Sequence, residues 1–394
     1  MTEPTRDEFA KLMTDRIRQA GEKGNIVYDP DEFRLRGDGK QAVTIFLENA
    51  YKEYCAADDE GRQRGLKIWV RNWFAFLRVA PDDFEDVKPD LLPAVRSRAY
   101  FDLNRLRAEA DSGKSFSWPY QVLGEHFGVG LVYDLRDSMQ SVTQGNLDAW
   151  GVTFYAAMEV AKQNLAALPA KFIGPPEGEG VYLSLTGDSY DASRLLLTDR
   201  VRQFNVKGDT IAMIPNRENL IVVGSEDVEG LAATLQLASE ALNKPRPISG
   251  IALRLDDDEW TPWLPPPSHP SYNDFQQFYL HTIGHDYAEQ TELLEKLHVK
   301  RGEDVFVASF SLAQTSDGTV FSYAAWTETT NTLLPKTDAL MLGRLGGKPA
   351  IVQWQKAMDV VGGLMEPLDI YPPRYRVREF PNDKQLAAMG NMLK

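Results

Sequence analysis

The chain has 394 residues, of which 43% are hydrophobic, so it is long enough to fold into two or three domains with ordinary cores. Its formal net charge of −14 at pH 7 disfavours nucleic acids and anionic membrane surfaces as partners. Cys55 is the only cysteine, which excludes an intramolecular disulfide and a cysteine-based zinc site, and no apolar run reaches the ~18 residues of a membrane span.

Residues 1–115 are expected to be mostly helical. Their start, MTEPTRDEFAKLMTDRI, is amphipathic and lacks the apolar core of a signal peptide, which favours a soluble, cytoplasmic protein. Apolar residues at helical spacing predict helices over Pro4–Gln19, Ile45–Ala57, Gln63–Leu77 and Val95–Ala108, with a small hairpin at Ile26–Arg36. The last of these helices carries Arg96, Arg98, Arg105 and Arg107, a local anion patch that the acidic run 82–90 offsets.

Residues 116–264 are predicted to form a central α+β domain. Short strands at Tyr120–Leu123, Gly130–Leu135 and Met139–Thr143 and a helix at Phe154–Leu168 open it. The next elements are expected at Val181–Leu185, Tyr190–Phe204, Thr210–Ile214, Leu220–Val223, Val228–Leu242 and Gly250–Leu255. Their βαββαβ order is typical of a split-βαβ, or ferredoxin-like, unit, in which the middle hairpin turns at Pro215–Asn219.

A third region, residues 265–394, is expected after the proline-dense segment Pro262–Pro270, which is interpreted as a stiff interdomain linker. It should open with a long helix over Tyr272–Leu297 and continue as a sheet with strands at Val305–Leu312, Val320–Trp326 and Ala339–Leu345. In the tail, a strand is predicted to turn Arg374, Arg376 and Arg378 outward. The whole chain is therefore predicted to be an α+β protein.

The stretch Gly180–Leu197, GVYLSLTGDSYDASRLLL, holds the candidate functional residues. Its alternating strand runs into Gly187, where the chain must turn sharply. One interpretation is a polar site at the strand–helix junction, built from Asp188, Ser189, Tyr190, Asp191 and Arg194. The other is a well-capped helix that needs no ligand, because Asp188 or Ser189 can accept a hydrogen bond from its first turn. Under both, two aspartates already occupy the helix start, which disfavours a phosphate at this turn.

Histidines on the predicted long helix raise the question of a metal site. His281 and His285 are four residues apart and Glu289 is four further on, so the three can share one helix face as ligands. A solvated helix face explains the same spacing, and the HExxH signature is absent. The serine nucleophile elbow, the Walker motif and the dinucleotide-binding glycine pattern are absent too, so no metal or cofactor is expected.

Eight runs of the chain carry a family resemblance. They are VRSRAYFDL, LGEHFGVGLVYDL, GDSYDASRLLLTD, IAMIPNRENLIVVGS, RPISGIALRL, YAEQTELLEKL, GEDVFVASFS and IYPPRYRVREF. In this order they resemble the YtpQ-like proteins, a bacterial family of unknown function, from about Val95 onward and more loosely before it. The resemblance implies a soluble bacterial cytoplasmic protein with no assigned activity, cofactor or partner. The run from Asp188 to Arg194 belongs to the family pattern, whereas the histidine pair does not.

Two classes of function remain open from the sequence. The first is a non-enzymatic interaction or scaffold protein with an unidentified protein partner, which the missing catalytic motifs and the charge of −14 favour. The alternative is a hydrolase or transferase that uses Asp188 and Asp191 with Arg194, because paired carboxylates can divide acid and base roles when their environments differ.

Overall fold

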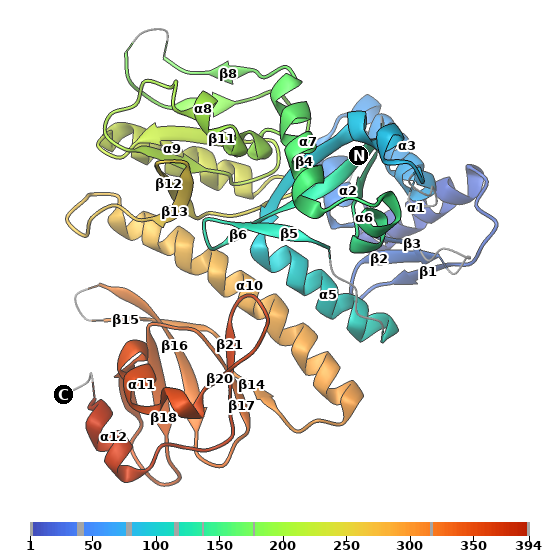
Figure 1. Ribbon diagram of the computed structural model, residues 1–394. Helices are drawn as coiled ribbons and strands as arrows, with labels where there is room; N and C mark the ends of the chain where they lie inside the picture. Colours follow the sequence, from blue (N-terminus) through green and yellow to red (C-terminus); the bar gives the residue numbers. More distant parts are fainter. Residues whose placement is uncertain are drawn as a thin grey trace.

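The computed structural model describes residues 3–37, 43–75, 81–113, 118–135, 138–175, 178–315 and 318–391. It contains helices together with antiparallel and mixed sheets, which confirms the predicted α+β class. The longest helix, α10 (Tyr272–Arg301), crosses the molecule between the C-terminal sheets and the sheets of the earlier chain (Figure 1). In the described ranges, no helix is both long and apolar enough to cross a membrane. The boundary predicted at 115/116 and the end of the helix predicted to Leu77 lie outside the described residues.

Three helices and a small sheet form the N-terminal part. The helices are α1 (Arg6–Gln19), α2 (Glu48–Ala56) and α3 (Asp59–Ala75), and the sheet has the order β1 (Ile26–Asp29), β2 (Arg34–Gly37), β3 (Val43–Phe46). Phe9, Met13, Leu35 and Trp73 are buried in their shared core. The helix predicted from Ile45 is wrong at its start, because Val43 and Ile45 are buried at alternate positions of β3, which pairs with β2. Period-2 burial of β-branched residues stabilises a strand at this point.

A second sheet joins this part to the middle of the chain. Its long strand β6 (Phe127–Leu135) pairs with β4 (Leu91–Ser97), β5 (Tyr120–Leu123) and β7 (Ser138–Ser141). The prediction of a helix from Val95 is wrong, since residues 91–95 are fully buried in β4 and α5 (Arg98–Ser112) begins only after Ser97 caps it. Four short or flanking helices complete this region: α4 (Phe84–Val87), η1 (Lys88–Asp90), α6 (Gln144–Trp150) and α7 (Phe154–Ala167), of which α7 packs against β4.

The central sheet has six strands in the order β13-β12-β10-β11-β9-β8, and each neighbouring pair is antiparallel. Its strands are β8 (Phe172–Ile173), β9 (Tyr182–Ser184), β10 (Thr210–Met213), β11 (Leu220–Gly224), β12 (Ala252–Asp256) and β13 (Glu259–Trp263), and its long helix is α9 (Val228–Leu242). The predicted hairpin around Pro215–Asn219 is confirmed, because β10 and β11 pair antiparallel on either side of it. The finer ferredoxin-like description is not confirmed, since the first crossover is not the predicted helix. The 3-10 helix η2 (Ala192–Leu196) and the four-residue α8 (Thr198–Val201) replace it.

The C-terminal part contains two four-stranded sheets, β14-β17-β21-β20 and β15-β16-β18-β19. Their elements are β14 (Phe306–Val307), β15 (Ser311–Gln314), β16 (Val320–Thr327), β17 (Thr332–Pro335), β18 (Ala339–Gly343), β19 (Ala350–Gln353), α11 (Trp354–Val361), η3 (Gly362–Leu364), β20 (Glu366–Pro367), β21 (Arg374–Val377) and α12 (Asp383–Met389). The prediction that Arg374 faces solvent is wrong, because α10 covers this end of β21 and the side chain donates to Gln290 and to the Ala308 and Leu333 carbonyls.

Helix α10 packs against both halves of the molecule. Leu293, Leu294 and Leu297 share a core with α5 on one side and with β14 and β17 on the other. Ile283 and Tyr287 belong to the core of the central sheets. The predicted domain boundaries at 115/116 and 264/265 stay predictions.

Candidate functional site

Asp191 closes the turn that follows β9. One oxygen of its carboxylate accepts from the Ser184 hydroxyl and, at 2.9 Å, from the Thr186 N–H, while the other accepts from the Gly187 N–H at 2.8 Å. Gly187 has a φ of 73°, a left-handed conformation that glycine adopts without steric cost. Because the Asp191 side chain is 0% exposed, its carboxylate is used inside the turn and does not face solvent.

Arg194 ties this turn to the chain beyond α7. Its two terminal nitrogens donate to the two Asp188 oxygens at 2.9 and 2.6 Å, and Nη2 also donates to the Pro169 carbonyl at 2.7 Å. Burial would raise the pKa of Asp188, but the hydrogen bonds and charge of Arg194 outweigh it and hold that pKa below its usual value. The Arg194 side chain is 1% exposed, so the arrangement is a closed clasp between two segments.

The structure therefore brings Asp188, Asp191 and Arg194 together, as the sequence predicts, but it buries two of them. The predicted cap is different in detail. Besides its bonds with Arg194, Asp188 accepts from the Tyr190 N–H at 3.0 Å, and Asp191 at the N-cap of η2 makes no side-chain cap bond. A substrate arriving from solvent meets neither the Asp191 carboxylate nor the Arg194 guanidinium in this conformation. Hydrolysis or transfer by these carboxylates stays a prediction.

Ser189 and Tyr190 face a second polar cluster. Ser189 has a φ of 71°, and its N–H and hydroxyl donate to the two oxygens of Glu218 at 3.0 and 3.1 Å. The Tyr190 ring is 2% exposed, and its hydroxyl lies near the Asp134 carboxylate without forming a hydrogen bond of good geometry. Burial and then the Asp134 charge raise the pKa of Tyr190, so this phenol keeps its proton. The buried hydroxyl is a donor without a well-placed acceptor in the described structure.

Two arginines converge beside this hydroxyl. Arg96 of β4 and Arg217 of the central hairpin turn both direct a terminal nitrogen at the Met139 sulfur, at 3.6 and 3.9 Å. A thioether is a weak acceptor, so neither guanidinium gains a strong bond from it. Arg217 Nε is buried and has no hydrogen-bond partner in the part of the chain that the structure describes, although it lies 3.8 Å from a Glu218 oxygen. Apart from the Val95 carbonyl, which accepts from Arg96 Nη1 at 2.7 Å, these donors have no strong acceptor in the described structure.

Arg246 adds a third positive charge to the same place. Its carbonyl accepts from the Arg217 N–H at 3.2 Å, so the two residues lie side by side, and its own guanidinium pairs with Glu53 at 2.7 Å. Burial first, and then the charges of Arg246 and Arg96, lower the pKa of Arg217 to about 9 against the opposing effect of Glu218. Arg217 therefore stays charged at pH 7. We call Arg96, Arg217 and Arg246 the arginine cluster.

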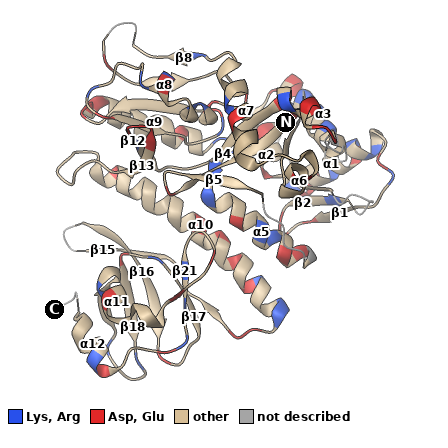
Figure 2. Cartoon of the chain, in the orientation of Figure 1, with Lys and Arg blue, Asp and Glu red and all other residues tan. Residues whose placement is uncertain are grey.

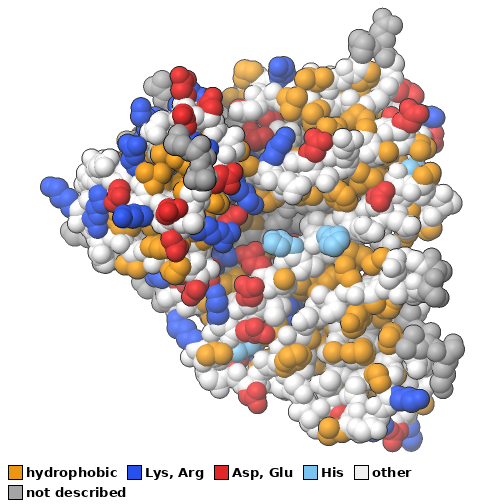
Figure 3. All heavy atoms as spheres, turned by 180° about the vertical axis from the view of Figure 1, so that it is seen from behind, with side chains coloured by type: hydrophobic (Ala, Val, Ile, Leu, Met, Phe, Trp, Pro, Cys, Tyr) orange, Lys and Arg blue, Asp and Glu red, His pale blue; other side chains and the backbone are white. Residues whose placement is uncertain are grey.

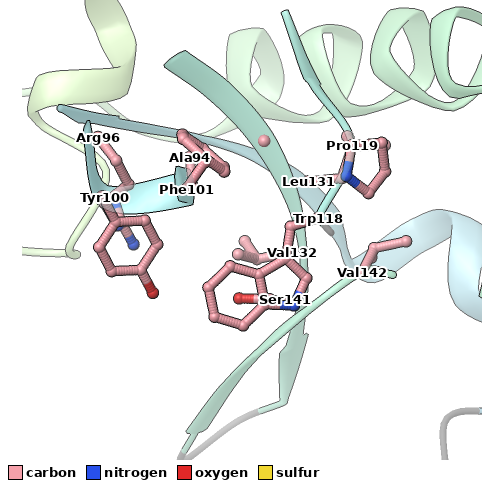
Figure 4. Close-up of a pocket in the computed structure, with 11 residues that line it drawn as sticks. Ala94, Arg96, Tyr100, Phe101, Trp118, Pro119, Leu131, Val132, Ser141 and Val142 are labelled. Atoms are coloured by element: carbon pink, nitrogen blue, oxygen red, sulfur yellow. The ribbon is translucent and has the colours of Figure 1, made fainter. Parts of the chain in front are cut away.

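The two sides of the arginine cluster offer very different amounts of space. On the Arg96 side, a cavity of about 20 Å³ is lined by this arginine, by the stacked rings of Tyr100 and Trp118, and by Ser141 (Figure 4). That volume holds little more than one water molecule. On the Arg246 side, an open groove of about 770 Å³ runs between α2 and the loops of the central sheet, lined by Arg246 and Glu218 among others. A ligand of ordinary size fits only the second side.

The three candidate metal ligands, His281, His285 and Glu289, do not form a common binding site in the structure. His281 and His285 are exposed on α10, and Figure 3 shows two histidine side chains close together on the rear face. Glu289, one turn further, accepts instead from the Arg107 guanidinium. In the described ranges, no three side chains of His, Cys, Asp or Glu are grouped so that they can hold a metal ion.

Sequence reasoning found one member of the arginine cluster and missed two. Arg96 was part of the predicted anion patch, but its neighbours Arg105 and Arg107 pair with acidic residues, as Arg105 does with Asp102 at 2.8 Å. Arg217 and Arg246 stand in loops with no distinctive spacing, more than a hundred residues from Arg96. The NRENL turn and the RPIS run that hold them, both among the runs quoted for the family resemblance, were the only signal.

Comparison with known proteins gives one relationship to report. A UPF0354 protein of Listeria welshimeri is 25% identical to this chain over 209 residues, which are 51% of this chain and 73% of the relative. No family model matches the chain, and no solved structure matches it. The similarity supports a place near an uncharacterised bacterial family.

Proposed function

We propose that the protein binds, without chemical conversion, a small molecule that carries a carboxylate or phosphate, and that the arginine cluster holds this anionic group. The observation that carries the proposal is the convergence of Arg96 and Arg217 on the Met139 sulfur, with Arg217 Nε buried and unpartnered in the described structure. An arginine is a planar fork of donors that suits carboxylate and phosphate oxygens, and a sulfur atom does not satisfy it.

The charges around the cluster support an anionic ligand. Of the acidic neighbours, Glu53 is committed to Arg246, and both oxygens of Glu218 accept from Ser189. Asp134 is a third acidic neighbour that interacts with Arg217, and burial raises the pKa of its carboxyl. In the described structure, neither Arg96 nor Arg217 has a carboxylate at hydrogen-bond distance. An incoming carboxylate or phosphate supplies this negative partner. The groove, which Arg246 lines but Arg96 and Arg217 do not, has room for the rest of the molecule.

Thermal unfolding in the presence of anions tests the proposal. Inorganic phosphate and citrate should each raise the unfolding midpoint of the wild-type chain in a saturable way, because a ligand that binds only the native state stabilises it. Chloride at the same ionic strength should not. Arg217→Gln should abolish the response, and it should raise the midpoint without anion, since a crowded charge is removed.

Arg202→Gln is the matched control. Arg202 is exposed at 41% of its side chain and pairs with Asp258 at 2.8 Å, a residue that takes no part in the arginine cluster. This variant should keep the full response to phosphate or citrate. An equal response of Arg217→Gln and the wild type would refute the proposal.

Three further proposals concern context. We propose that the chain belongs with the YtpQ-like proteins, which its ordered runs support, while its similarity to the Listeria protein supports only an uncharacterised bacterial family. We also propose that it is cytoplasmic, which fractionation of the host would test.

Nucleic acid should not bind, since the net charge is −14 and basic and acidic residues are interspersed on α3, α5 and α10 (Figure 2). Salt-sensitive submicromolar binding to an oligonucleotide would contradict this.

A further inference from the structure

A second cavity lies where α10 meets the C-terminal sheets. It has a volume of about 110 Å³, and its walls come from the turn between β5 and β6, from α10, and from loops of the C-terminal part. An engineered cavity of ~150 Å³ takes up benzene, so this one has room for a molecule of about five heavy atoms. It does not share a lining residue with the groove beside the arginine cluster.

His126 lines this cavity, and its hydrogen bond fixes which ring nitrogen carries the proton. Its Nδ1 is hydrogen-bonded to the Tyr371 hydroxyl, and the ring is 6% exposed. Burial lowers the pKa of His126 to about 4, so the imidazole is neutral at pH 7. The Tyr371 proton has no other acceptor in the described structure, and burial raises the pKa of that phenol, so the phenol donates to Nδ1. The remaining proton of the imidazole therefore sits on Nε2.

Lys336 supplies a positive charge at the same cavity. Its ammonium has no ion pair or hydrogen bond within the described ranges, and it is near enough to His126 to contribute to the lowered pKa of that ring. The nearest acidic groups compete little for it. Asp338 accepts through one oxygen from the Ser322 N–H at 2.8 Å and the Ser322 hydroxyl at 2.7 Å, and Glu125 is exposed at the mouth.

Two aromatic rings form part of the cavity lining, and the hydroxyl that one of them carries is already hydrogen-bonded. The rings of Tyr287 and Phe310 stack at 5.1 Å with 15° between their planes. The Tyr287 hydroxyl donates to the Pro373 carbonyl at 2.8 Å and accepts from the Lys336 N–H at 3.0 Å, so it offers no further donor. A ligand here meets both polar donors and apolar ring surface.

We propose that this cavity is a second ligand site, which takes a small organic carboxylate with its oxygens on His126 Nε2–H and the Lys336 ammonium and its body against Tyr287 and Phe310. Plain acids and zwitterionic amino acids share this chemistry. They differ only in whether Asp338 and Glu125 gain an ammonium to pair with.

Nuclear magnetic resonance of the full chain with ¹⁵N-labelled histidine tests the site. The probes are propionate, L-alanine and propionamide, and the His126 signal is identified by its loss in His126→Gln. A saturable shift of this signal with propionate or L-alanine is expected. The compound that saturates the shift at the lower concentration shows which source of carboxylate the site prefers. Propionamide should bind at least tenfold more weakly, since it lacks the charge that Lys336 pairs with.

Lys336→Met provides the main comparison, because Lys336 is exposed and its replacement should leave the fold intact. It should weaken carboxylate binding about tenfold, whereas Lys348→Met, an exposed lysine of the same region, should leave it unchanged. Arg217→Gln should also leave carboxylate binding at the His126 cavity unchanged, so the two proposed sites can be tested separately. Equal binding of propionamide and propionate, or no saturable shift with either acid, would overturn the proposal.

Discussion

Two ionisable residues are buried on or against α10, and they differ in whether they keep their charge at pH 7. Arg374 is 0% exposed, and its guanidinium donates to Gln290 Oε1 at 2.5 Å, to Thr291 Oγ1 at 2.7 Å and to backbone carbonyls. Burial lowers the pKa of Arg374 to about 10, which leaves it charged at pH 7. Asp286 is 9% exposed and has neither a hydrogen bond nor an ion pair in the described structure, so burial, with a smaller effect of Glu289, raises its pKa to about 8. A buried group keeps its charge only where partners replace water.

The raised pKa of Asp286 predicts a pH-dependent stability. Between its unfolded pKa of ~3.9 and its folded pKa of about 8, the native state holds a proton that the unfolded chain has released, so this group's contribution to stability is full below pH ~4 and is lost as pH rises towards 8. Asp286→Asn should therefore stabilise the protein more at pH 8 than at pH 5.

Urea unfolding at the two pH values measures this effect. The exposed Glu292, two turns along the same helix, provides the control Glu292→Gln, which should change stability by under ~0.5 kcal/mol at both pH values. A gain from Asp286→Asn that is the same at pH 5 and pH 8 would show that the carboxyl titrates normally in the native state.

At the scale of elements, the clasp after β9 replaces a helix. The Asp191 carboxylate binds N–H groups that precede it, so it is not available to the first turn of a helix, and the chain continues as the tighter η2. Removing one partner of the clasp should leave a buried charge unpaired. We predict that Arg194→Ala lowers the free energy of unfolding by about 3 kcal/mol, because Asp188 and Asp191 lose their cation.

Chemical denaturation of a double-mutant cycle on Asp188 and Arg194 measures the coupling directly. Arg202→Ala, which breaks only an exposed pair with Asp258, should cost under ~1 kcal/mol. If Arg194→Ala left the unfolding midpoint unchanged, the clasp would not be structural, and a direct functional role of Arg194 would gain support.

The sequence predicted those elements whose signal is local. α1, α10 and the β10–β11 hairpin follow from long apolar stripes or from a turn between two alternating strands, and each is found. The helix predicted from Val95 overlaps the end of β4, because the apolar run there has no period of its own and only pairing with β6 determines that it is a strand. The same limit applies to Arg374, whose burial depends on α10 lying across β21.

The candidate site was predictable only in part, for the same reason. The clasp residues are close in sequence, so their grouping was visible from spacing. The arginine cluster joins β4 to two loops that lie more than a hundred residues further on, and no local pattern marks residues that meet only through the fold. A cavity such as the one at His126, which needs a turn, a helix and the C-terminal loops at once, was beyond the same reasoning.

At the scale of the molecule, α10 makes the two halves depend on each other. Its leucines lie in one core with α5 and with β14 and β17. If α10 separated from either half, apolar surface on both α10 and that half would become exposed to water. Ion pairs along the same contact, such as Lys296 with Glu32 and Arg301 with Glu109, are exposed and contribute little beside the buried leucines. Unfolding of the C-terminal sheets and of β4–β6 should therefore be cooperative.

Leu297→Ala tests that cooperativity. Leu297 is 2% exposed, so its truncation should cost about 2–5 kcal/mol, whereas Val299→Ala on the same helix, 83% exposed, should cost under ~0.5 kcal/mol. Native-state hydrogen exchange followed by mass spectrometry reads peptides from β6 and from β16 separately. If the halves unfold together, Leu297→Ala lowers the opening free energy of both sets of peptides by the same amount. A loss confined to β16 would mean that the C-terminal sheets unfold on their own while β6 keeps its protection, and α10 would then belong energetically to one half.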